Sequence, residues 1–398
     1  MSQFNFEEAA RSIQDDDYSQ FKEAFNRGLE EDETHALLRL SVAHSRKFIC
    51  EFIIKNSKIE PSFKNECQAI AATQEDLTVF DLLSNDGVGE QTWLNLFNVQ
   101  PLSVIKPIVE KNDIPEDHGL LIIQYALANQ DPEVHKLAFD KIYKAELIED
   151  ETEKRNLLDS IAFSGNLNLL DYVEGTSELK KSLEEKQNKH AGFAELLDEY
   201  IGFIFDNTPK EKVASTVNGL HLMEEIKKNP NVEDWDLIIQ DYLVNEETEL
   251  VDRAENTPSE NVKKVHELLK ANELKLMEIS DVIPQEYKIT GKDVISGADL
   301  EVALDRRIYD PRCIYLCYVL NLDGTSYICS HPLLILPDRK SLIQLGLRKE
   351  KDRKQQQSGK KSKTKKKPSK KVSLTSAEKF KYLLGEHIRS RKEIDDSV

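Results

Sequence analysis

The sequence predicts a mainly α-helical protein with a small α+β module near its C-terminus and a basic tail after that module. Three observations support this fold class. Glycine and proline are scarce, at 15 and 13 of 398 residues, and 32% of the residues are charged, which favours helices over a β-sandwich or barrel. Apolar residues recur three and four positions apart as far as about Met277. After Pro284 the pattern changes to short runs of β-branched and aromatic residues.

Five helical hairpins recur between residues 34 and 176. Each has a short apolar helix, a polar break and a second helix, as in 37–57, 69–87 and 157–177. The second helices align on apolar anchors: Ile49, Phe52, Ile53; Val79, Leu82, Leu83; Ile105, Ile108, Val109; Val134, Leu137, Ala138; Leu169, Tyr172, Val173. Small or apolar residues precede these anchors by seven or eight positions: Ser41, Val42, Ala71, Ala72, Phe97, Ala126, Ile161, Ala162. Because one hairpin cannot bury its apolar face alone, the pattern predicts a stack.

The fifth unit, "LLDSIAFSGNLNLLDYVEGTS", resembles an ankyrin repeat. Leu158, Ala162, the Gly165-Asn166 turn and the helix at Leu169 fall where that family places them. The other four units resemble it more loosely, and none has the Thr-Pro-Leu-His opening. The resemblance implies an ankyrin-like solenoid over roughly residues 34–176 that binds a protein partner on its extended surface. Hairpins of another α-solenoid type and an irregular helical core are the alternatives.

The pattern divides the chain into five parts. We expect a helical repeat domain at 1–176, a helical extension or cap at 177–277, a small α+β module with a β-hairpin at 278–346, a disordered basic arm at 347–372 and a terminal amphipathic helix at 373–398. In the third part, residues 286–311 suggest a short strand and a short helix.

The β-hairpin also holds a candidate zinc cluster. Asp323-Gly324 is the signature of a two-residue turn, which pairs Leu322 with Thr325 and Tyr318 with Cys329. Four potential ligands lie nearby, namely Cys313, Cys317, Cys329 and His331. With that turn, Cys313 and Cys317 face one side and Cys329 and His331 the other, so buried cysteines without metal are the preferred interpretation. A longer turn that shifts the strand register by one residue would place all four potential ligands on the same face of the hairpin.

The charge is unevenly distributed. The net charge is -18, yet residues 348–371 hold thirteen Lys or Arg and two acids. The core of this arm is Lys360, Lys361, Lys363, Lys365, Lys366, Lys367, Lys370 and Lys371. Four interpretations are open: a nuclear localisation signal, a grip on nucleic-acid phosphates, a segment that folds back on the acidic body, or a solubilising linker. The first is preferred, so we expect the protein in the nucleus, the cytoplasm or both.

The short signatures of common enzymes are missing. The chain has no G-x-S-x-G, H-E-x-x-H, H-R-D or G-x-G-x-x-G motif, and no apolar run approaches the length of a membrane span. Five cysteines without a secretory signal indicate reduced thiols. We therefore expect a non-enzymatic adaptor without cofactor or membrane contact. Its acidic body would bind a protein partner, and the charge favours a basic one. A nucleic-acid-associated factor is the alternative.

Overall fold

The computed structural model describes residues 2–84, 87–220, 248–271, 274–305, 313–329 and 332–344, and the single positions 223, 227, 239, 346, 347, 349 and 383. The chain divides into two compact units, Met1–Lys180 and Lys181–Val398, which are treated separately below. The described residues are mainly helical, with a small antiparallel sheet in the second unit. The sequence-based prediction of this mixture is confirmed.

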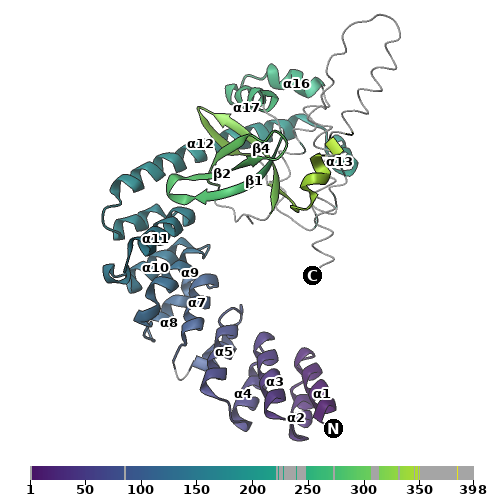
Figure 1. Ribbon diagram of the computed structural model, residues 1–398. Coiled ribbons are helices and arrows are strands. Elements are labelled where there is room, and N and C mark those ends of the chain that lie inside the picture. Colours follow the sequence, from purple (N-terminus) through teal and green to yellow (C-terminus); the bar gives the residue numbers. More distant parts are fainter. Residues whose placement is uncertain are drawn as a thin grey trace, which may run out of the picture. The chain divides into compact units, whose positions relative to one another are not determined.

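The first unit is a series of helix pairs (Figure 1). The pairs are α1 (Ser2–Gln14) with α2 (Tyr18–Asn26), α3 (Glu31–Ala43) with α4 (Lys47–Asn56), α5 (Pro61–Ala71) with α6 (Thr78–Leu83), α7 (Glu90–Val99) with α8 (Leu102–Val109), α9 (Gly119–Leu127) with α10 (Pro132–Ile142), and α11 (Glu151–Ser164) with the 3-10 segment η4 (Leu167–Tyr172). Short 3-10 turns, η2 (Glu116–His118) and η3 (Ala145–Leu147), precede α9 and α11. The pair α1–α2 lies before the five units that the sequence pattern predicts.

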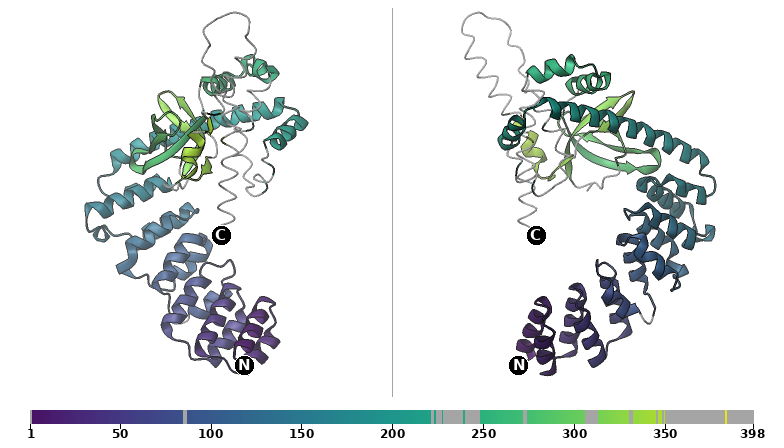
Figure 2. Two further views of the ribbon diagram at one scale, coloured as in Figure 1. Left: turned by 45° about the vertical axis from the view of Figure 1, so that its right-hand side comes forward. Right: turned by 180° about the vertical axis from the view of Figure 1, so that it is seen from behind.

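These pairs stack in two rows (Figure 2). The first helices α1, α3, α5, α7, α9 and α11 pack each on the next. In the second row, α2 packs on α4, α4 on α6, α8 on α10, and α10 on η4. Most helices of the array therefore pack against the next pair as well as against their own partner, as expected of stacked hairpins.

The anchor positions explain the stacking. In four of the five predicted units the first and third anchors are buried, for example Ile49 with Ile53 and Val134 with Ala138. The unit of α8 buries only Ile105 among its three anchors, and Pro107 interrupts that helix. The small or apolar residues before the anchors are buried throughout, so the helices of each pair approach closely.

Side chains in two successive turns tie their pair to the preceding one. Gln100 Nε2 donates to the carbonyl oxygens of Ala72 at 2.8 Å and Gln74 at 2.9 Å. One pair later, Asn129 Nδ2 donates to the carbonyls of Phe97 at 2.9 Å and Gln100 at 3.0 Å. These carbonyls lie at or just after helix C-termini, where the backbone has no intrahelical partner. The turn amides thus satisfy acceptors that the helices leave open.

The second unit begins within α12 (Ser177–Asn207) and continues with α13 (Lys210–Gly219), α16 (Thr248–Glu255) and α17 (Glu260–Ala271). The expected helical extension is wrong at its end, because Leu274–Met277 already belongs to strand β1 (Leu274–Ile283). The segment Leu274–Met277 is apolar at both ends, and a pattern of only four residues fits the period of a helix as well as that of a strand. The pairing of β1 with its two neighbours, β2 and β4, makes this segment a strand. Within 286–311 the expected short strand is confirmed as β2 (Lys288–Asp293), whereas the expected short helix is wrong, because Asp299–Ala303 forms the strand β3.

The C-terminal hairpin has the predicted register. It consists of β4 (Ile314–Leu322) and β5 (Thr325–Ile328), and Leu322 pairs with Thr325. The turn residues Asp323 and Gly324 have φ values of 51° and 85°, as a type I′ turn requires. The Cys329 amide donates to the Tyr318 carbonyl at 3.0 Å, so the same register extends beyond β5.

The sheet curls towards a closed barrel. Its strand order is β3-β2-β1-β4-β5, and β6 (Leu333–Ile335) also pairs with β4. The two ends of this order, β3 and β5, lie against each other. Helix α17 packs on β4, and Phe193 of α12 stacks on Tyr327 of β5 with ring centroids 4.4 Å apart. Covered by side chains on both faces, β4 is buried over seven successive residues.

His266 makes the second unit sensitive to acid. It is 1% exposed on α17, and its Nδ1 lies 3.4 Å from the Tyr200 hydroxyl of α12. Burial and then Lys270 lower its pKa, against the opposing effects of Glu255 and Glu267. The unfolded chain therefore binds a proton at a higher pH than the folded chain, so stability falls as pH drops below about 6.5.

We expect His266→Gln to remove this part of the pH dependence. Thermal unfolding of wild type and variant between pH 7.5 and 5.5 measures the dependence of the unfolding free energy on pH. The variant should lose at most about 1.4 kcal/mol per pH unit of that slope. Equal slopes in the two proteins would show that His266 does not titrate on unfolding.

Candidate functional site

The structure separates the candidate zinc ligands. Cys313, Cys317 and Cys329 are buried, at 7%, 1% and 7% exposure. Cys317 is adjacent to Tyr318 along β4, and Tyr318 is hydrogen-bonded opposite Cys329, so Cys317 and Cys329 face opposite sides of the ladder. His331 lies outside the described residues. Within the described part of the chain, no group of three or more His, Cys, Asp or Glu side chains could hold a metal ion.

Of the predicted basic arm at 347–372 only Leu347 and Lys349 are described, and all eight of its core lysines lie outside the described residues. Two further cysteines belong to the core of the first unit. Burial raises the pKa of Cys50 to about 11 and that of Cys67 to about 12, so both thiols are protonated at neutral pH. Their environment is that of packing residues.

The first unit carries almost the whole net charge of the chain. Residues 1–180 contain 17 Lys or Arg and 34 Asp or Glu, a net charge of -17, which leaves -1 for residues 181–398. Many of the acids gather where one pair connects to the next, at or just before the first helices: Glu30, Glu31, Asp32, Glu33; Glu60; Glu90; Asp113, Glu116, Asp117; Glu146, Glu149, Asp150, Glu151, Glu153. We call this row the inter-hairpin edge.

The local reason for these acids is helix capping. Asp150 accepts backbone hydrogen bonds from Thr152 and Glu153, and Glu30 forms a capping box with Glu33. A carboxylate at a helix N-terminus also interacts favourably with the helix dipole. The first helices of stacked hairpins run in the same direction, so their N-termini share one side of the array. Capping alone therefore concentrates negative charge along that side.

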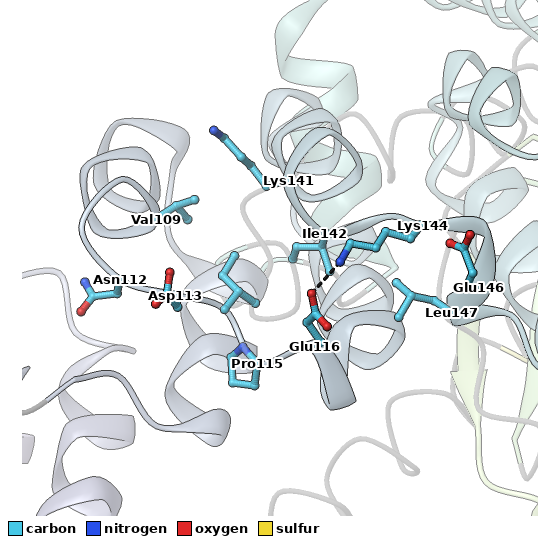
Figure 3. A pocket seen from close by; sticks show the side chains of 11 residues that line it. Val109, Asn112, Asp113, Pro115, Glu116, Lys141, Ile142, Lys144, Glu146 and Leu147 are labelled. Carbon is cyan, nitrogen blue, oxygen red and sulfur yellow. Dashed lines mark hydrogen bonds and ion pairs between the residues drawn. The ribbon is translucent and has the colours of Figure 1, made fainter.

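A cavity of about 330 Å³ opens within this edge (Figure 3). The segment after α8 and the segment after α10 form its walls. The lining residues are Val109, Asn112, Asp113, Ile114, Pro115, Glu116, Lys141, Ile142, Lys144, Glu146 and Leu147. Aliphatic side chains thus alternate with charged ones.

One ion pair crosses the cavity. Lys144 Nζ lies 2.5 Å from Glu116 Oε1, and this hydrogen bond lowers the pKa of Glu116. Figure 3 shows Ile142 and Leu147 on either side of the pair, whereas Lys141 points away. Both partners of the pair are largely exposed, so its contribution to stability is small and it is readily exchanged for a contact with another molecule.

Gly119 fixes the apolar side of the cavity. A Cβ atom at this position would lie 3.0 Å from Ile142 and 3.1 Å from Leu147, so the start of α9 touches both side chains. An aliphatic surface beside carboxylates suits a long basic side chain, whose methylene groups need apolar contact and whose head needs an anion. The sequence shows the acidic runs, but the cavity depends on two segments that only the stacking brings together.

Comparison with known proteins identifies no relative. No family model, no curated protein and no solved structure matches the chain. Among the described residues, no helix is long and apolar enough to cross a membrane.

Proposed function

We propose that this protein is a non-enzymatic adaptor whose helical array binds a basic protein partner along the inter-hairpin edge. The observation that carries the proposal is the net charge of -17 within residues 1–180, with acids gathered on one side of the stacked pairs. Such a field attracts a positively charged surface and speeds its association. A stack of hairpins also offers an extended surface of the kind that repeat proteins use for binding.

The array is best explained as a degenerate ankyrin-like solenoid. Gly165 supports this assignment, because it ends α11 in the left-handed conformation with φ of 75° and is followed by a short second helical segment.

The proposed role of residues 348–371 is a nuclear localisation signal, since a short run of Lys and Arg is what such signals require. The adaptor would then work in the nucleus as well as the cytoplasm.

Two charge reversals test the edge. The cavity variant carries two substitutions at residues that line the cavity, Asp113→Lys and Glu146→Lys. The control variant makes the same change of charge on the opposite side of the array, in the turns within the pairs, with Asp15→Lys and Glu75→Lys. Pull-downs use both full-length variants and wild type in nuclease-treated cell extract at about 50 mM salt. We expect the cavity variant to recover basic proteins on the order of tenfold less well, equivalent to about 1.4 kcal/mol, and the control to resemble wild type.

Equal recovery of basic proteins by the cavity variant and the control variant would contradict binding at this edge.

A second function, association with nucleic acid, is favoured by the thirteen Lys or Arg of residues 348–371. If recovery in untreated extract collapses after nuclease treatment in all three proteins, this second function replaces the adaptor proposal.

A further inference from the structure

A second cavity, of about 470 Å³, lies in the second unit at one end of the curled sheet. Its walls come from α12, the β1–β2 connection, the end of β3 and the start of β5. The lining residues are Lys186, Lys189, Glu286, Tyr287, Lys288, Glu301, Val302, Ala303, Gly324, Thr325, Ser326 and Tyr327. It thus opens where β3 and β5 meet, between the β1–β2 and β4–β5 connections.

Three lysines approach this cavity from two elements. Lys288 Nζ lies between carboxylates, 2.5 Å from Glu286 and 3.5 Å from Glu301. On α12, Lys189 contacts Glu185 at 2.8 Å, whereas Lys186 donates to the neutral main-chain carbonyl of Glu286 at 2.9 Å. The lining residues hold three Lys against two Glu, a positive balance in a chain whose net charge is -18.

The rim of the cavity is held in an unusual backbone conformation. Tyr287 has a φ of 54°, which is rare for an aromatic residue, and its ring is 6% exposed. Its hydroxyl lies 3.3 Å from Nδ1 of His190, and its carbonyl accepts from the Leu304 amide at 3.0 Å. Strained residues held by several partners are common at ligand sites.

The topology indicates a ligand class. Around the curled sheet the strands follow the order 1-2-3-5-4, with β1 paired to both β2 and β4. Partly open five-stranded barrels with this connectivity bind oligonucleotides and oligosaccharides on the face of their second and third strands and at the β1–β2 and β4–β5 loops. Because one topology serves many functions, the choice between these ligands rests on the side chains.

The side chains favour phosphate over base or sugar rings. The Tyr327 ring is 3% exposed and already stacked on Phe193, and Tyr287 is buried, so neither offers a free face for stacking. Lysine ammonium groups and the hydroxyl groups of Thr325 and Ser326 line the opening instead, and both donate hydrogen bonds to phosphate oxygens.

We propose that this cavity binds the sugar–phosphate backbone of single-stranded nucleic acid, with Lys186 and Lys189 contacting phosphates. Its lining residues all belong to the second unit and include none of residues 348–371. It therefore stands or falls independently of the protein partner proposed above.

Fluorescence anisotropy with labelled oligo-dT, oligo-U and a DNA duplex of equal length tests the proposal on the full chain. The cavity variant carries Lys186→Gln and Lys189→Gln. The control variant carries Lys181→Gln and Lys210→Gln, which remove two exposed lysines outside the cavity. Each lost phosphate contact on a single strand lowers the slope of log affinity against log salt by about 0.7, so the cavity variant should lose about 1.4. At 50 mM salt this corresponds to single-strand binding on the order of 50-fold weaker.

The duplex distinguishes the cavity from the arm, because a run of Lys and Arg side chains grips the phosphates of duplex and single strand alike. We expect duplex binding to be the same in both variants. The proposal is overturned if the two variants bind single strands equally, or if the cavity variant loses duplex and single-strand binding to the same extent.

Discussion

Replacing Gly291 by alanine should destabilise the second unit by about 3 kcal/mol or more. Gly291 is a buried residue of β2 that pairs with Ile279 of β1, next to an irregularity in the β1 register. A Cβ atom here would lie 2.4 Å from the carbonyl oxygen of Glu278 and 3.0 Å from Met277 Cε. The closest atom belongs to the backbone of the neighbouring strand, so the strain cannot be relieved by turning a side chain.

Gly202→Ala is the matched control, because it makes the same chemical change on α12 where the added methyl group meets nothing within 4 Å. In a helix this change should stabilise by about 0.5–1 kcal/mol. Hydrogen exchange of peptides from 274–303 measures the effect of Gly291→Ala locally, and exchange of peptides from α12 measures that of Gly202→Ala. Similar exchange in wild type and Gly291→Ala would mean that β1 and β2 approach less closely than described.

Gln100→Ala should destabilise the first unit by about 2–3 kcal/mol, the second largest effect that we expect. The side chain is 6% exposed and supplies two hydrogen bonds, to the carbonyls of Ala72 and Gln74. Its removal leaves both acceptors without this donor, and each buried polar group left unsatisfied costs about 1 kcal/mol or more.

The control for this change is Gln91→Ala on the same helix pair, where the amide makes only an exposed contact with Asn95 at 3.2 Å. Its loss should cost a few tenths of a kcal/mol. Urea unfolding followed through the buried Trp93 of α7 compares the two variants. If the midpoints shift equally, the inter-pair hydrogen bonds do not hold the array together.

Much of the helical array follows from local sequence, because burial of one helix face repeats every three or four residues. The anchors Ile49 and Val134 were predicted on this basis and are buried. The hairpin register followed in the same way from Asp323-Gly324, since a two-residue turn permits one pairing. Strand β1 was missed because its identity comes from partners far along the chain, β2 and β4, rather than from its own pattern.

The candidate sites were less accessible to sequence reasoning. The charge of the arm at 348–371 is evident from composition, whereas both cavities are assembled by residues that are distant in sequence, such as Lys186 with Gly324. From the sequence, the acidic runs were recognised only as a contribution to the net charge of the chain. Their alignment on one edge depends on the common direction of the first helices, which the predicted hairpins already implied.

The hydrogen bonds of the turns have a direction. Gln100 and Asn129 each reach back to carbonyls of the preceding pair, so a later hairpin completes acceptors that an earlier one has already presented. A chain leaving the ribosome exposes its N-terminal pairs first, and domains generally form in that order during synthesis. Each new hairpin of this array would then meet a finished template, which makes the order of translation also the order of assembly.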